Sequence, residues 1–215
     1  MEKAFIFDMD GTLFDTETVT REALRAVSHN HGEREDIDAF YSTTCGVTRA
    51  VAEQLYKAFF GEEYPVSDRR EEMRSWIKGY IDTNGIPIKT GARELLTYLK
   101  DNGYKIALAT STRRASAEGH VQKAGFAPFF DATVCGDEVQ HSKPHPEIFL
   151  TAAKKLGVSP ENCYVVEDSY FGVEAGAAAG MKVFMIPDLN PPRDKERALA
   201  YHIGNTLLDI LNYIR

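Results

Sequence analysis

The first apolar run of the chain ends in two carboxylates. The run from Lys3 to Phe7 is short, apolar and β-prone, and Asp8 and Asp10 follow it at once. Such a run is typical of a strand buried on both faces of a parallel sheet. Carboxylates at the end of such a strand can work as general acids and bases or bind a hard cation.

Reactive and charged side chains also follow three further predicted strands. They are Thr110 and Ser111 after the second strand, Lys143 in a loop after the third, and Glu167 and Asp168 after the fourth. Ligands of open parallel sheets bind outside the carboxyl ends of the strands, so we expect these groups to meet Asp8 and Asp10. Four carboxylates at one place repel one another unless a cation joins them. The arrangement implies a hard, oxygen-preferring ion such as Mg2+.

Strands and helices alternate through most of the chain. Beyond the first, strands are expected at 105–110, 132–135, 164–166 and 182–186. Helices are expected at 91–102, 145–156, 172–179 and 206–214, and a further helical stretch follows the strand 105–110 and ends at Ala124. This alternation predicts right-handed crossovers and an α/β fold with a doubly wound, mostly parallel, Rossmann-like sheet.

The segment between the first strand and Gly85 has a different pattern. Apolar residues repeat at helical spacing over 16–29, 51–59 and 73–81, and no convincing strand interrupts them. We therefore expect two domains: an α/β core formed by residues 1–14 and 86–215, and a helical cap inserted at 15–85.

Composition excludes several classes of function. The 215 residues carry 25 Lys and Arg against 32 Asp and Glu, a formal net charge of −7, which disfavours a nucleic-acid or anionic-membrane surface. No stretch approaches the roughly 20 apolar residues that cross a bilayer. Cys45, Cys135 and Cys163 form no CxxC pair, so a reducing cytoplasm is the simplest compartment. A compact core and an acidic cap are compatible with a monomer.

Four motifs in order carry a resemblance to a known family. The first is Asp8-Met-Asp10-Gly11-Thr12, and the others are Thr110 in Ala-Leu-Ala-Thr-Ser-Thr, Lys143 in Ser-Lys-Pro-His-Pro-Glu, and Glu167-Asp168 in Val-Val-Glu-Asp-Ser. Together they resemble the haloacid dehalogenase superfamily of phosphohydrolases over essentially the whole core. A cap directly after the first motif is similar to the subfamily that contains β-phosphoglucomutase and small phosphate-ester phosphatases.

The resemblance implies a catalytic role for each of the first carboxylates. Asp8 would attack phosphorus and form an aspartyl-phosphate. Asp10 would protonate the leaving alkoxide and then activate water. Mg2+ would be held by Asp8, the Asp10 backbone carbonyl and Asp168, with Glu167 either as a ligand or as support for the ligands.

The resemblance also implies the groups that bind the phosphoryl oxygens. Lys143 and the Thr110 hydroxyl would stabilise them, with help from the Ser111 and Gly11 backbones. In the cap, Thr43 to Arg49 resembles the substrate-contacting loop of β-phosphoglucomutase, where an arginine aligned with Arg49 holds the distal phosphate.

One departure from the family pattern separates two activities. Mutases of this family carry a histidine in the first cap helix where this chain has Thr20. Its absence favours hydrolysis of a small phosphorylated metabolite, such as a sugar phosphate, over the alternative, β-phosphoglucomutase. A pseudouridine or nucleoside 5'-phosphatase and a non-catalytic module similar to phospho-receivers are further alternatives.

Overall fold

The computed structural model describes residues 3–34, 36–45 and 49–215, except for the side chain of Arg49. The chain divides into two compact units, one formed by Met1–Asp15 and Ile86–Arg215, the other by Thr16–Gly85. The boundary lies one residue beyond the expected one, at Asp15.

The first unit is built on a parallel sheet of six strands. In chain order these are β1 (Ala4–Phe7), β2 (Lys105–Thr110), β3 (Ala132–Cys135), β4 (Cys163–Glu167), β5 (Lys182–Met185) and β6 (His202–Ile203). Their spatial order is β3-β2-β1-β4-β5-β6, and every pair is parallel, which confirms the predicted fold class. From β1 the chain proceeds to β2 and β3 on one side and then crosses to β4 on the other side of β1, so β1 lies at the point where the strand order reverses.

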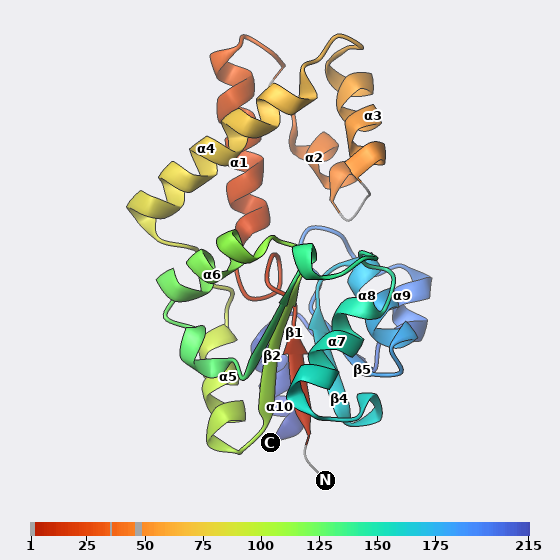
Figure 1. Ribbon diagram of the computed structural model, residues 1–215. Coiled ribbons are helices and arrows are strands. Elements are labelled where there is room, and N and C mark those ends of the chain that lie inside the picture. The colour runs from red at the N-terminus through yellow and green to blue at the C-terminus, as the bar shows by residue number, and fades with distance from the viewer. Residues whose placement is uncertain (1–2, 35, 46–48) are drawn as a thin grey trace. The chain divides into compact units, whose positions relative to one another are not determined.

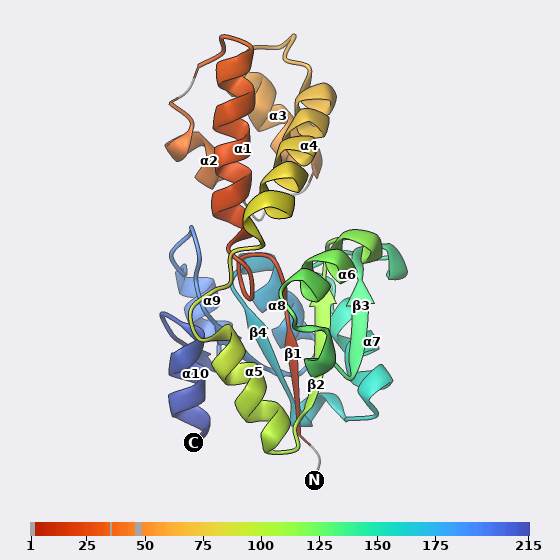
Figure 2. The same cartoon turned by 90° about the vertical axis from the view of Figure 1, so that its left-hand side faces the viewer.

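Helices cover both faces of this sheet (Figures 1 and 2). One face carries α5 (Ala92–Asp101), α6 (Arg114–Lys123) and α10 (Leu207–Ile214); the other carries α7 (Glu147–Leu156) and α8 (Tyr170–Ala178), against which α9 (Asp194–Leu199) packs. All four residues of β1 are fully buried because they pack against helices on both sides. The sheet therefore holds the end of β1 in a rigid frame.

The second unit consists of helices in the described residues. They are α1 (Thr16–Asn30), α2 (Asp38–Thr44), α3 (Arg49–Phe60) and α4 (Val66–Asn84). Figure 2 shows α1 and α4 side by side, and the two helices are in contact. Aromatic rings fill the core around α2 and α3, where Phe40 stacks on Phe59 with ring centroids 4.1 Å apart and Phe60 on Tyr64 at 4.3 Å.

Three elements were not expected from the sequence. The helix α2 has only seven residues, too few for an apolar repeat, and its two buried side chains, Phe40 and Tyr41, are adjacent. The helix α9 starts at Asp194, inside a Pro-rich stretch that reads as a loop, and β6 has two residues. Elements this short depend on tertiary packing more than on local pattern.

Candidate active site

Lys143 joins two of the predicted carboxylates at the end of the central strands. Its Nζ donates to Asp8 Oδ1 at 2.5 Å and to Glu167 Oε1 at 2.7 Å, and also to the Ala109 carbonyl at 3.2 Å. The Lys143 side chain is 7% exposed, so these are buried ion pairs. Parallel register explains the meeting, because Phe7 of β1 lies opposite Leu108 of β2 and Val166 of β4.

The electrostatics of the buried pair show a site with too little positive charge. Burial raises the pKa of Asp8 to about 8, and the charges of Glu167 and Asp10 add to this rise while Lys143 opposes it. Burial also disfavours the charge of Lys143, but Asp8 and Glu167 outweigh it and raise the pKa of the ammonium. Asp8 therefore needs a second cation nearby to be fully ionised near neutral pH.

Glu167 is committed to contacts within the protein. Its Oε1 accepts from Lys143, and its Oε2 accepts from the Asp168 and Ser169 backbone N–H groups and the Ser169 hydroxyl, at 2.9–3.0 Å. The first turn of α8 makes room for this carboxylate with glycine: a Cβ on Gly172 would lie 1.8 Å from it. Glu167 is thus a fixed anion that holds Lys143 beside Asp8.

The turn after β1 brings Asp168 against the first motif. Gly11 has a φ of +80°, which side chains rarely adopt, and a Cβ there would lie 2.4 Å from Asp168 Oδ2. Thr12 donates its hydroxyl to the other oxygen of Asp168 at 2.8 Å. Glycine at this position thus permits both the turn and the close approach of the carboxylate.

Asp10 is oriented by Thr112, in the loop that follows β2. The Thr112 hydroxyl donates to Asp10 Oδ2 at 2.6 Å, and the Thr112 backbone N–H donates to Thr110 Oγ1 at 3.1 Å. Thr110 is buried, whereas Ser111 is exposed and its carbonyl lies against Gly136, where a Cβ would come within 2.1 Å.

The sequence did not single out three of these contacts: the hydroxyls of Thr112 and Thr12, and Gly172 beneath Glu167. The Thr residues lie inside quoted motifs and Gly172 lies three residues after the end of the last one, so proximity to a motif was the available signal. Of the predicted residues, Arg49 alone belongs to the second unit. It begins α3, but its side chain and residues 46–48 of the same loop lie outside the described part of the chain.

The donor set near β1 suits a hard cation. Asp8, Asp10 and Asp168 offer oxygen atoms, the ligands that Mg2+ prefers, and the excess of carboxylates over Lys143 leaves negative charge for such an ion to balance. Glu167 fits less well as a direct ligand because both of its oxygens already accept hydrogen bonds.

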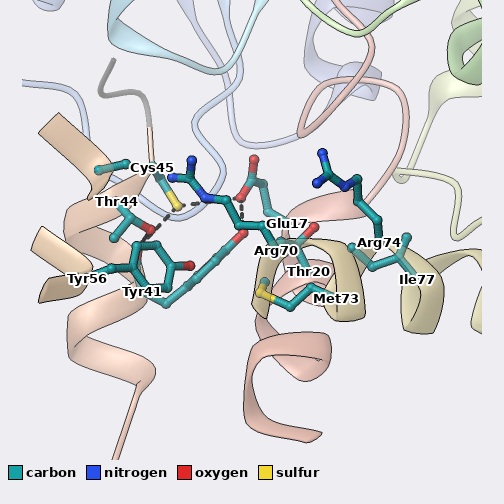
Figure 3. Close-up of a pocket in the computed structure, with 11 residues that line it drawn as sticks. Glu17, Thr20, Tyr41, Thr44, Cys45, Tyr56, Arg70, Met73, Arg74 and Ile77 are labelled. Atoms are coloured by element: carbon teal, nitrogen blue, oxygen red, sulfur yellow. Dashed lines mark hydrogen bonds between the residues drawn. The ribbon is translucent and has the colours of Figure 1, made fainter. Parts of the chain in front are cut away.

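The second unit holds a pocket of about 310 Å3 among its helices, shown in Figure 3. Glu17, Arg70 and Arg74 direct their charged groups to the same side of it. Glu17 accepts a hydrogen bond from the Tyr41 hydroxyl at 2.7 Å, and Arg70 lies 5.6 Å from the ring centroid of Tyr56. Neither guanidinium forms an ion pair within the described residues.

The wall of this pocket also contains Thr20. Its hydroxyl donates to the Thr16 carbonyl one turn earlier in α1 at 2.8 Å, a bond within the helix. The position therefore carries a short side chain whose hydroxyl proton already forms a hydrogen bond.

No helix among the described residues is both long and apolar enough to span a membrane.

Comparison with known proteins agrees with this geometry. A family model described as haloacid dehalogenase-like hydrolase matches residues 2–180. A phosphorylated carbohydrates phosphatase of Thermotoga maritima is 34% identical over 183 residues, covering 84% of this chain and 82% of the relative. A β-phosphoglucomutase crystal structure from Clostridium difficile superposes with a TM-score of 0.76 at 29% identity, covering 100% of this chain and 96% of the other.

A longer relative matches almost the whole chain. It is the bifunctional riboflavin kinase/FMN phosphatase of Arabidopsis thaliana, 33% identical over 217 residues, which cover 98% of this chain. The match spans 55% of that relative, so the chain corresponds to little more than half of it.

Proposed function

The chain belongs to the haloacid dehalogenase-like hydrolase family and is a phosphohydrolase, and we propose that it is a Mg2+-dependent phosphatase of a small phosphorylated metabolite, in the first place a sugar phosphate. The observation that supports this proposal best is the buried Lys143 held between Asp8 and Glu167. A fixed ammonium beside a carboxylate nucleophile neutralises charge at the point where a phosphate ester must approach it.

In the proposed reaction Asp8 is the nucleophile. One of its oxygens forms a bond to phosphorus as the ester P–O bond breaks, which leaves an aspartyl-phosphate and an alkoxide. Asp10 gives the alkoxide its proton, so the alcohol departs neutral. Asp10 then takes a proton from water, whose oxygen attacks phosphorus, and the acyl phosphate breaks to return Asp8 and release inorganic phosphate. The Thr112 hydroxyl on Asp10 Oδ2 orients this acid and base.

Mg2+ fits this site through oxygen ligands alone. We assign it to Asp8, the Asp10 backbone carbonyl and Asp168, and we assign Glu167 to support because its two oxygens are already bonded. When bound, the ion supplies positive charge to the phosphoryl oxygens. Lys143 and the Thr110 hydroxyl, with the Ser111 and Gly11 backbones, complete the proposed binding of those oxygens.

The pocket of the second unit is proposed to bind the part of the substrate that is not transferred. Arg70 and Arg74 suit an anionic group, and the Glu17 carboxylate suits a hydroxyl. Sugar phosphates with a second phosphate or a carboxylate offer both kinds of group. By family resemblance Arg49, the first residue of α3, would contribute as well.

The second candidate is β-phosphoglucomutase, favoured by the likeness to the Clostridium difficile enzyme. A mutase must keep water from its phospho-enzyme. In such enzymes a histidine couples cap closure to the general acid, and this chain has Thr20 at that position. Its hydroxyl proton is bonded to the Thr16 carbonyl instead. Thr20 therefore favours hydrolysis.

A phosphate-release screen with Mg2+ separates these readings. It covers sugar phosphates, nucleoside monophosphates and FMN, and β-glucose 1-phosphate is also assayed for glucose 6-phosphate with a trace of the bisphosphate. We expect phosphate release from one group of sugar phosphates, loss of that activity with EDTA, and recovery when Mg2+ is returned. Glucose 6-phosphate formed without phosphate release would instead establish a mutase, and turnover unaffected by EDTA would overturn the assignment of Mg2+.

A further inference from the structure

Two histidines and a glutamate meet on the surface of the first unit, in the loop that carries Lys143. His141 Nδ1 lies 2.8 Å from Glu147 Oε2, and His145 Nδ1 lies 4.0 Å from the same oxygen. The centroids of the two imidazole rings are 4.5 Å apart, and one ligand atom from each of the three side chains lies within 4.8 Å of the others. The proposed catalytic reaction uses none of them.

We propose that His141, His145 and Glu147 form a second metal site, selective for a borderline divalent ion such as Zn2+ or Ni2+. Zn2+ holds nitrogen and oxygen ligands at about 2.0–2.2 Å in a tetrahedron, which places neighbouring ligand atoms about 3.3 Å apart. The present distances of 2.8 and 4.0 Å lie on either side of that value. Small rotations of exposed side chains can therefore form the site.

The backbone holds these ligands in place before any metal arrives. The Gln140 and His141 N–H groups donate to the two oxygens of Glu147 at 2.9 and 3.0 Å, which fixes the carboxylate at the start of α7. Pro144 and Pro146 restrict the backbone on both sides of His145. These three residues therefore lose less conformational freedom when a metal ion binds than the same residues would in an unrestrained loop.

The hydrogen bonds of both histidines are compatible with a metal. His145 Nδ1 accepts the Glu147 backbone N–H at 3.3 Å, so its lone pair is available in exchange for one long hydrogen bond. His141 Nδ1 donates to Glu147, and an ion that replaces this proton releases it to the solvent. The remaining coordination position is open to water.

The chemistry of the ligands separates this site from the one at β1. Imidazole favours Zn2+, Ni2+ and Cu2+, whereas the aspartates near β1 favour Mg2+. An ion bound here would also tie the loop before Pro144 to the first turn of α7. Lys143, which reaches Asp8, lies between the two tied ends.

Calorimetric titration of the untagged full chain with Zn2+, in excess Mg2+ to fill the oxygen site, tests the proposal without any turnover. We expect one Zn2+ per chain in the wild type. His141→Ala and His145→Ala should each weaken binding by about tenfold or more. Glu147→Gln should also weaken it, although the amide keeps an oxygen that can accept the backbone N–H.

His31→Ala is the matched control, because His31 Nε2 contacts Glu72 at 2.7 Å as a histidine–glutamate pair on the other unit. Circular dichroism confirms that each variant is folded. Retained affinity in His31→Ala with loss in the other three supports the site. Equal Zn2+ affinity in His141→Ala, His145→Ala and the control would overturn it, as would a wild type that binds no Zn2+ in the presence of Mg2+.

Discussion

Asp8 is largely buried beside a lysine, and burial raises its pKa to about 8. In the proposed reaction its oxygen makes the bond to phosphorus. Asp8→Asn replaces that oxygen with nitrogen at nearly the same shape, so we expect phosphate release to fall by at least about a thousandfold while the protein remains folded. A phosphate-release assay with a thermal melt as control measures both. Substantial turnover by clean Asp8→Asn protein would exclude Asp8 as nucleophile.

Thr112 tests whether positioning of Asp10 matters to the same reaction. Its hydroxyl donates to Asp10 Oδ2 at 2.6 Å, and Thr112→Val removes that donor without a change of shape. We expect kcat to fall by about tenfold with little change in KM, because the acid and base loses its orientation. Thr112→Ser keeps the hydroxyl and should recover most of the rate. If serine and valine variants are equally slow, the hydroxyl has no positioning role.

At the scale of the element, α8 carries the close contact that keeps Glu167 in place. A Cβ on Gly172 would lie 1.8 Å from the Glu167 carboxylate, so Gly172→Ala must displace that carboxylate or the helix. We expect the free energy of unfolding to fall by about 1–3 kcal/mol and activity to fall with it. Thermal or urea unfolding measures this change.

Gly119 in α6 provides the matched control for that substitution. No atom lies within 4 Å of the position of its Cβ, so Gly119→Ala should be neutral or stabilising by up to about 1 kcal/mol. Destabilisation of both variants to the same extent would show that the contact with Glu167 does not decide the result, because helix propensity alone favours alanine over glycine.

The helix α4 supplies the two guanidiniums of the pocket in the second unit. If they bind an anionic group of the substrate, Arg70→Gln should raise KM about tenfold and leave kcat nearly unchanged. Lys78→Gln removes an exposed cation on the same helix that pairs with Asp82, and it should change neither constant. Equal effects of the two substitutions on KM would point to general electrostatic attraction and away from a contact in the pocket.

Strand ends could be predicted from the sequence, and side-chain hydrogen bonds could not. The apolar runs ending at Phe7 and Thr110 defined β1 and β2 well, because strands buried on both faces have a continuous apolar pattern. The Thr112 bond to Asp10 joins residues 102 positions apart and depends on rotamers that no spacing encodes. The space at Gly172 depends likewise on how α8 packs over β4.

At the scale of the whole molecule, paired carboxylates in the first unit determine its response to acid. Arg193 holds the pKa of Glu196 below its ordinary value, and Glu196 is fully buried. Burial alone would raise the pKa of Glu138, but the Cys135 N–H, Arg114 and Lys155 outweigh it and lower the pKa. A carboxylate with a lowered pKa in the folded state binds its proton more readily once the chain unfolds.

The stabilisation from these groups is therefore complete above their ordinary pKa values and is lost as pH falls through the lowered ones. For glutamate, whose ordinary value is 4.5, we expect the part of the melting temperature that Glu138 and Glu196 contribute to be nearly constant from pH 7 to about 5 and to decline below about 4.5. The raised pKa of Asp8 affects the wild type and Glu138→Gln alike, so the difference between the two proteins isolates the part of Glu138. Glu138→Gln should lower the melting temperature at pH 7 and make the decline below pH 4.5 shallower, because one titrating group has been removed. Melts followed by circular dichroism across this range measure both effects. An unchanged acid slope in Glu138→Gln would mean that the Glu138 ion pairs with Arg114 and Lys155 contribute nothing to stability.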